Sequence, residues 1–223
     1  MTVGRGEFGT TRIAWMDAAH HHLVATEVLD GLGEQQARRF EVLTGMAARR
    51  FLATRWLARH LVAELTDDTS LVLTTTCRRC GGDHGQPRFD TAPVAVSFAY
   101  AGSVAVVAAA SVADASAVGV DIEHDRGDDP ALPLPELTSL FAPSRPPTLQ
   151  EWTLIEAALK ADGRGLTVEL SQVEVGPSGF ESTHPVWIPG RSDPVHAMEI
   201  DGPEGFILSA ATVPAVAQSR HPD

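Results

Sequence analysis

The feature that most constrains the fold is a long stretch without a charged side chain, Thr91 to Ala113. This stretch is long enough to span a bilayer. However, it consists mostly of Ala, Ser and Val, and Pro93 and Gly102 interrupt it. Short runs of such residues around a glycine turn are typical of a β-hairpin. We therefore predict two strands, Val94 to Tyr100 and Val104 to Ala110, and no membrane span.

Helices are predicted on both sides of this hairpin. Residues 17–30, which include three consecutive histidines, and residues 34–65 have apolar side chains at helical spacing. A further helix is predicted from an N-cap at Thr148 to about Asp162, because Glu151 completes a capping box and glycines follow the helix. The segment from Asp125 to Pro147 is acidic and rich in proline, which indicates a loop with a short helix near residues 137–141.

The other predicted strands are short. They are residues 71–75, the strand that carries Asp121 and Glu123, and residues 170–175, 186–188, 195–200 and 206–212. Each half of the chain thus combines helices with short strands. We predict an α/β (α+β) fold with two similar subdomains, residues 1–113 and 114–223, each a small, mainly antiparallel sheet with packed helices.

Charge is distributed unevenly along the 223 residues. The formal net charge is −12; residues 1–112 carry 11 basic and 11 acidic side chains, whereas residues 113–223 carry 6 and 18. This sign argues against a nucleic-acid partner. Six arginines of the first half predict a positive surface that binds an anion, or a solvated helix face. They are Arg38, Arg39, Arg49, Arg50, Arg55 and Arg59.

Three carboxylates and one amine are spaced so that they can form one site. Asp121 and Glu123 are two apart on a predicted strand and therefore share a face. Glu156 and Lys160, the only lysine of the chain, are one helical turn apart. Oxygen-rich clusters of this kind suit Mg²⁺, which takes one or two carboxylates together with water and substrate phosphate. In isolation, the same residues are more typical of exposed strand-end acids and a surface ion pair, and it is their combination that favours a site.

The two cysteines of the chain, Cys77 and Cys80, are too few for a disulfide framework, and the first twenty residues do not have the pattern of a signal peptide. We therefore expect a cytoplasmic protein. With His84, the cysteines have the spacing of a partial zinc knuckle, but a structural zinc site requires four ligands. A tight turn followed by two glycines is the alternative.

Several motifs in residues 35–170 occur in a recognisable order. They are Val118-Gly119-Val120-Asp121; the helix positions Trp152, Glu156, Ala157, Lys160, Gly163, Gly165 and Leu166; Gly85-Gln86-Pro87; Val96-Ser97-Phe98 followed by Gly102; and Arg49-Arg50-Phe51-Leu52. In these motifs the chain resembles the Sfp-type 4′-phosphopantetheinyl transferases, whose signatures are (V/I)-G-(V/I)-D and W-x-x-K-E-A-x-x-K-x-x-G-x-G-L. Paired long motifs are far more specific than a lone glycine pattern.

The resemblance implies a fold of two similar halves with the active site between them. It also implies a Mg²⁺-dependent enzyme, monomeric, which transfers the phosphopantetheine arm of coenzyme A to a serine of an acyl or peptidyl carrier protein in polyketide, nonribosomal peptide or fatty-acid assembly. Asp121, Glu123 and Glu156 would hold the metal. Glu156 would activate the serine, directly or through water, and Lys160 would stabilise the leaving phosphate. Residues that would contact coenzyme A are Arg50, Gln86, Pro87, Ser97 and Phe98.

Three positions depart from the family pattern, because Gln86, Phe98 and Ile155 replace basic residues. Two of these, at 86 and 98, are positions that the family uses to hold coenzyme A phosphates. Loss of such charge-assisted bonds weakens nucleotide binding, although Arg50, Arg78, Arg79 or Arg88 could compensate. Two alternatives follow: a repurposed enzyme that acts on an acyl chain already attached to a carrier protein, and a non-catalytic module that binds the carrier.

Overall fold

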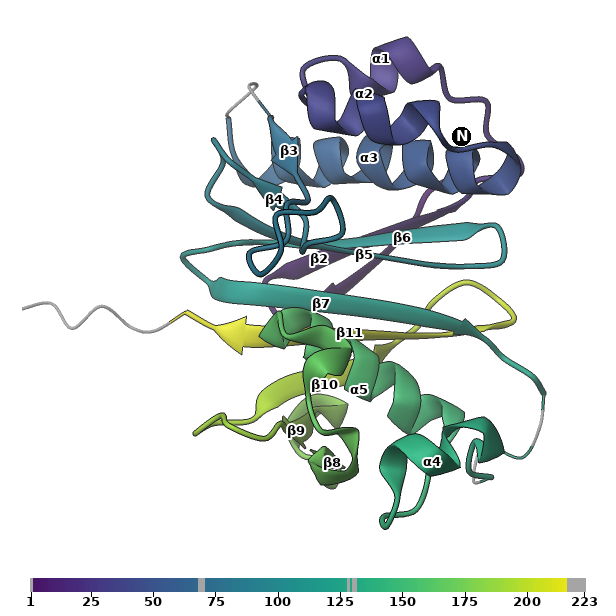
Figure 1. The fold of residues 1–223 in the computed structure, drawn as a ribbon, viewed down its shortest axis with the longest axis vertical. Coiled ribbons are helices and arrows are strands. Elements are labelled where there is room, and N and C mark those ends of the chain that lie inside the picture. Colours follow the sequence, from purple (N-terminus) through teal and green to yellow (C-terminus); the bar gives the residue numbers. More distant parts are fainter. Residues whose placement is uncertain (1, 68–70, 128, 130–131, 216–223) are drawn as a thin grey trace, which may run out of the picture.

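The computed structural model describes residues 2–67, 71–127, 129 and 132–215, and it is a mixed α+β fold with two antiparallel sheets. Helices cover the outer faces of both sheets (Figure 1). Among the residues described, no helix is both long enough and apolar enough to cross a membrane.

The first sheet has six strands in the order β1-β2-β6-β5-β4-β3, and the second has five in the order β7-β11-β10-β9-β8. The strands of the first sheet are β1 (Gly4–Phe8), β2 (Thr11–Asp17), β3 (Leu73–Thr74), β4 (Arg88–Phe89), β5 (Val94–Ala101) and β6 (Val104–Ser111). Those of the second are β7 (Ala115–His124), β8 (Glu174–Val175), β9 (His184–Trp187), β10 (Val195–Ile200) and β11 (Phe206–Pro214). Each sheet is therefore built from one contiguous part of the chain.

Five α-helices lie among the described residues: α1 (Ala25–Leu29), α2 (Glu34–Glu41), α3 (Gly45–Leu65), α4 (Thr138–Phe141) and α5 (Leu149–Asp162). In Figure 1, α1, α2 and α3 lie on one side of the molecule, and α4 and α5 lie on the other, beyond β7. Short 3₁₀ helices occupy Pro135–Leu137, Gly165–Thr167, Leu170–Gln172 and Phe180–Ser182.

Three apolar clusters fill the spaces between these layers. One joins α3 to the outer face of the first sheet, and another joins α5 to the outer face of the second sheet. The third contains side chains from both sheets. Strand β6 shows the arrangement best, because Ala105, Val107 and Ala109 belong to the α3 cluster, whereas Val106 and Ala108 belong to the cluster between the sheets. A strand buried on both faces needs a continuous apolar sequence, which explains the uncharged stretch.

The predicted hairpin, α5 and the last two predicted strands are confirmed. The hairpin is β5 and β6, and the last two strands are β10 and β11. Helix α5 begins with the predicted capping box of Thr148 and Glu151, and it ends at Gly163, which adopts a left-handed conformation (φ 83°). The short helix near residues 137–141 is present as the 3₁₀ turn and α4, whereas residues 128, 130 and 131 of the predicted loop lie outside the described residues.

Other predictions are wrong in part. Residues 17–30 are not one helix, since β2 ends at Asp17, helical structure is confined to α1, and the three histidines lie between the two. The predicted helix 34–65 is divided into α2 and α3, because Thr44 takes an extended conformation as the N-cap of α3. The hairpin of β1 and β2 was not predicted. Residues 170–175 form a 3₁₀ turn followed by the two-residue β8, and the predicted strand at 186–188 is β9, which begins and ends earlier.

Candidate functional site

The candidate site lies where α5 crosses β7. Side chains alternate along β7: Val118, Val120 and Ile122 join the cluster between the sheets, which places Gly119 and Asp121 on the opposite face, toward α5. A Cβ atom at Gly119 would lie 1.8 Å from the carbonyl oxygen of Ala157. Only glycine permits this approach, and it brings the α5 side chains against the β7 carboxylates.

Lys160 binds the buried carboxylate of Asp121. Its Nζ lies 2.6 Å from Asp121 Oδ1, 3.0 Å from the carbonyl oxygen of Val120 and 3.9 Å from Glu156 Oε2. The Asp121 side chain is 6% exposed, against 32% for Lys160 and 25% for Glu156. The sequence-predicted group of Asp121, Glu156 and Lys160 is thus assembled at the surface of the α5–β7 contact.

The carboxyl groups of Asp121, Glu123 and Glu156 all have pKa values above their usual range. Burial, followed by the charge of Asp121, raises the pKa of Glu156 to about 7. Burial raises the pKa of Asp121 even though Lys160 opposes this shift, and burial together with the charge of Asp121 raises the pKa of Glu123. The site therefore holds more negative charge than one lysine compensates.

One acceptor atom in this site has no donor. Asp121 Oδ2 is buried and makes no hydrogen bond, although the carboxyl groups of Asp121 and Glu156 can share one when either is protonated. A proton or a cation satisfies an acceptor in this position. The residues thus fit a hard divalent cation held by Asp121 and Glu156, with half-buried Glu123 farther along the same face of β7. However, the carboxylate oxygens of Asp121, Glu123 and Glu156 do not all lie within 4.8 Å of one another, so the three groups are not a preformed set of metal ligands.

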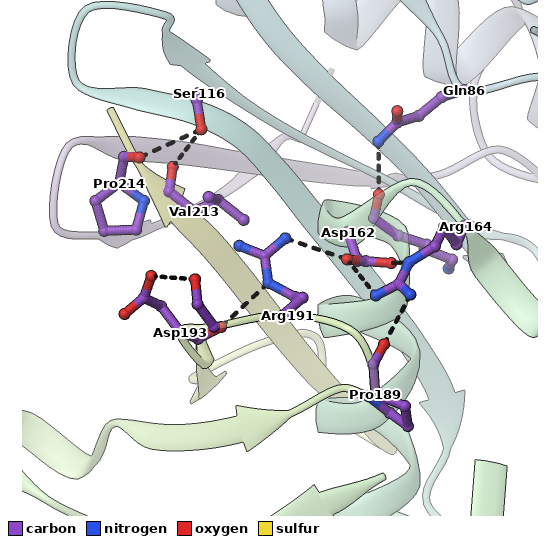
Figure 2. Close-up of polar contacts among 11 residues, drawn as sticks. Gln86, Ser116, Asp162, Arg164, Pro189, Arg191, Asp193, Val213 and Pro214 are labelled. Atoms are coloured by element: carbon purple, nitrogen blue, oxygen red, sulfur yellow. Dashed lines mark hydrogen bonds and ion pairs between the residues drawn. The ribbon is translucent and has the colours of Figure 1, made fainter. Parts of the chain in front are cut away.

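Gln86 connects the first half of the chain to the end of α5. Its Nε2 donates to the carbonyl oxygen of Lys160 at 2.6 Å, which Figure 2 shows at the C-terminal end of the helix. Pro87 follows it and is half-buried. The turn that carries Gln86 and Pro87 is therefore in contact with the helix that carries Glu156 and Lys160.

The C-terminus of α5 is held by an Arg-Asp-Arg cluster. Asp162, whose side chain is 2% exposed, lies between Arg164 and Arg191 (Figure 2), with N–O distances of 2.6 and 3.1 Å. Although burial raises the pKa of Asp162, hydrogen bonds from both arginines lower it below its usual value. Arg164 also donates to the carbonyl oxygen of Pro189. This cluster ties α5 to the β9–β10 connection and so fixes the position of Lys160.

Ser97 and Phe98 lie on opposite faces of β5. The hydroxyl of Ser97 is buried and accepts a hydrogen bond from the backbone N–H of Val120 at 3.1 Å, so it links β5 to β7. Phe98 packs against the α3 cluster, with the Arg55 guanidinium 5.1 Å from its ring centroid. The interpretation of Phe98 as core filling is confirmed, and its ring is on the face of β5 away from Asp121.

The six arginines do not form one open positive surface. Arg55 is buried: its guanidinium lies 3.6 Å from the Phe51 ring and donates to Gln36 Oε1. Burial, followed by the charge of Arg39, lowers the pKa of Arg55 to about 9. Arg50, the predicted contact for coenzyme A, donates to the carbonyl oxygen of Gly102 at 3.0 Å and lies over the Tyr100 ring.

Arg38 and Arg59 also have partners within the chain. Arg38 pairs with Glu34, and Arg59 donates to backbone carbonyls around α1. Of the predicted patch, Arg38 and Arg49 are exposed, and Arg49 makes one bond to the carbonyl of Ala19. The sequence could not distinguish the roles of Arg50, Arg55 and Arg59, because their partners are far away in the chain.

Ile155, at a position that is basic in the signature of the transferases that the sequence resembles, is 3% exposed and packs in the α5 cluster together with Trp152 and Leu159. The predicted packing role of these three side chains is confirmed. A lysine at position 155 would bury its charge in the core of this structure, so restoring the family residue would destabilise the protein rather than extend the site.

A pocket of about 270 Å³ lies beside this site. Its lining is more apolar than polar, and comprises Asp125, Arg126, Asp129, Leu132, Pro133, Leu134, Pro135, Leu149, Gln150 and Ile207. Ile207 is the cross-strand partner of Glu123. The pocket therefore opens next to the outer carboxylate of β7.

Sequence reasoning did not find three contacts of this site: the Val120 carbonyl, the Gln86 bond and the Arg-Asp-Arg cluster. Their partners are far apart in the chain and none belongs to a local motif. Comparison of the sequence with protein-family models and with curated proteins gives no match.

Proposed function

We propose that this protein transfers the 4′-phosphopantetheine arm of coenzyme A to a serine of an acyl or peptidyl carrier protein in the cytoplasm. The observation that carries the proposal is the group formed by Asp121, Glu156 and Lys160, in which a buried carboxylate oxygen has no donor next to a lysine ammonium. An oxygen-rich site with one amine suits a pyrophosphate and its divalent cation.

Asp121 and Glu156 would hold Mg²⁺, and Glu123 would bind it through water. A bound Mg²⁺ would neutralise pyrophosphate oxygens as charge develops on them. Lys160 is held by the Val120 carbonyl and by Asp121, and one remaining N–H can donate to the leaving phosphate. The Glu156 carboxylate would accept the proton of the carrier serine, directly or through water.

The test is conversion of a carrier protein from its apo to its holo form. Full-length protein, coenzyme A, Mg²⁺ and apo carrier should yield a carrier with the mass of one added phosphopantetheine. Chelation of the metal should stop the reaction, and Glu156→Gln should lower its rate by about 10²- to 10⁴-fold. Glu169→Gln makes the same chemical change at an exposed position and should leave the rate unchanged. A wild-type protein that adds no mass would contradict the proposal.

A second candidate function is action on an acyl chain already attached to the carrier. Two observations favour it: Gln86 and Phe98 replace basic positions of the family, and a partly apolar pocket opens beside Glu123. In the same experiment this enzyme would leave apo carrier unmodified but would change the mass or retention time of an acylated carrier. A module that only binds, when immobilised on a column, would retain the carrier protein but would modify neither the apo carrier nor the acylated carrier.

A further inference from the structure

A second group of side chains of types that bind metals lies outside the α5–β7 site, in the loop between β3 and β4. The possible ligand atoms of Cys77, Cys80 and His84 all lie within 4.8 Å of one another. Among the residues that the structure describes, this is the one trio of Cys, His, Asp or Glu that meets this spacing. Two thiols and an imidazole are a donor set that zinc prefers over magnesium.

The ligand atoms of the trio lie close to the spacing that a four-coordinate metal requires. Cys80 Sγ and His84 Nε2 are 3.0 Å apart. Ligands bound to one tetrahedral zinc, with Zn–S near 2.3 Å and Zn–N near 2.0 Å, lie about 3.5 Å apart. Small side-chain rotations of these exposed residues would therefore admit the ion without a change in the backbone.

The backbone of the loop is already folded around the sulfur atoms. The N–H groups of Cys80 and Arg79 donate to the Cys77 sulfur. The loop closes on itself through Cys77 N–H to the Gly82 carbonyl at 2.7 Å and Gly81 N–H to the Cys77 carbonyl at 2.9 Å. A Cβ atom at Gly82 would lie 3.1 Å from His84 Cδ2 and 3.5 Å from Cys80 Sγ, so glycine leaves room for both ligands.

We propose that Cys77, Cys80 and His84 bind one zinc ion, with water as the fourth ligand. The nearest acid in sequence, Asp83, is engaged elsewhere, because its Oδ1 accepts a hydrogen bond from Gln35 Nε2 at 2.5 Å. Cys80 and His84 are exposed, so solvent reaches the fourth position. Three protein ligands and one water form a known type of zinc coordination.

The water in the fourth position distinguishes this ion from a structural zinc with four protein ligands, but the loop that holds it is joined to the rest of the fold. His84 is two residues before Gln86, whose amide donates to the Lys160 carbonyl at the end of α5. An ion bound at residues 77–84 would restrict the loop that carries Gln86. Zinc would therefore stabilise the contact between the two parts of the chain, independently of whether the α5–β7 site transfers phosphopantetheine.

The experiment is a metal titration of the full-length chain under reducing conditions. The protein should carry His20→Ala, His21→Ala and His22→Ala, so that three consecutive histidines do not compete for the metal. Zinc titrated in competition with a chromophoric chelator should reach one equivalent. Cobalt(II) in its place should give an ultraviolet thiolate-to-metal charge-transfer band and the strong visible absorption of a tetrahedral ion.

In this background, Cys77→Ser, Cys80→Ser and His84→Ala should each lose the stoichiometric site, whereas His60→Ala, which changes another exposed histidine, should retain it. Circular dichroism should show that every variant is folded. The proposal would be overturned by a folded protein that binds no zinc, by zinc retained in a cysteine variant, or by cobalt spectra without a thiolate band. A Cys77–Cys80 disulfide that persists in the presence of reductant would also overturn it.

Discussion

The chemistry of single residues in the α5–β7 site is governed first by the burial of its carboxyl groups and then by their mutual repulsion. Asp121, Glu123 and Glu156 meet one ammonium group, and each has a raised pKa because burial penalises its charged form. Because these pKa values are raised, ionisation of the three carboxyl groups at neutral pH lowers the free energy of unfolding. A site that is costly without a cation gains affinity for one, because the bound ion relieves the repulsion.

Metal-free protein should therefore become less stable as pH rises from 5 to 8. The folded pKa of Glu156 is about 7, above its ordinary value of 4.5, so the folded state binds this proton more tightly and the free energy of unfolding falls through that interval. In wild type, Glu156 should lower the free energy of unfolding by on the order of 2–3 kcal/mol between pH 5 and 8, and Glu156→Gln should remove this decrease. Urea denaturation with chelator present measures the difference. Equal pH slopes for Glu156→Gln, wild type and the exposed control Glu169→Gln would refute this explanation.

At the scale of elements, the site depends on how closely α5 lies on β7. Gly119→Ala would place a Cβ atom against the Ala157 carbonyl, which is backbone and cannot rotate away. We expect a loss of unfolding free energy of about 1–3 kcal/mol or more. Gly179→Ala is the control, because its nearest contact would be 3.5 Å, and it should cost at most about 1 kcal/mol. Thermal and chemical denaturation measure both; equal losses would mean that the helix can move away from β7.

The start of α5 is stabilised by its capping box, in which Thr148 accepts from Glu151 N–H at 3.2 Å and Glu151 accepts from Thr148 N–H at 2.8 Å. Thr148→Ala should cost about 1 kcal/mol of stability. The matched control is Thr44→Ala, at the N-cap of α3, where no side-chain cap bond is present. The control should be close to neutral in urea denaturation. A loss at Thr44 as large as that at Thr148 would contradict the assignment.

Elements with local signals were predicted from the sequence, and elements without them were not. Helix α5 was found because its cap and its terminal glycine are close in sequence. Strand β2 was missed because its partner, β6, is far along the chain, and its edge partner β1 is short. Within the site, the spacing of Asp121, Glu156 and Lys160 was sufficient to group them. The Gln86 contact joins residues 74 apart and has no local pattern.

At the scale of the whole molecule, one buried hydroxyl connects the two sheets. Strand β7 is the edge of its sheet, and its Val120 N–H donates to Ser97 of β5. Ser97→Ala would leave this buried N–H without an acceptor and should cost about 1–3 kcal/mol. Ser192→Ala, which removes an exposed hydroxyl bonded to Asp193, should change stability by less than about 0.5 kcal/mol. Hydrogen exchange at Val120 should accelerate in the first variant alone; unchanged exchange would contradict this role.

The doubly covered strand β6 has a consequence for biosynthesis. When a ribosome has released only the residues up to Ser111, the side chains of Val106 and Ala108 have no opposing layer, because β7 and β11 are not yet made. The nascent chain then exposes a broad apolar surface to solvent. We expect a chaperone to bind at this stage of translation and to be released once β11 has emerged.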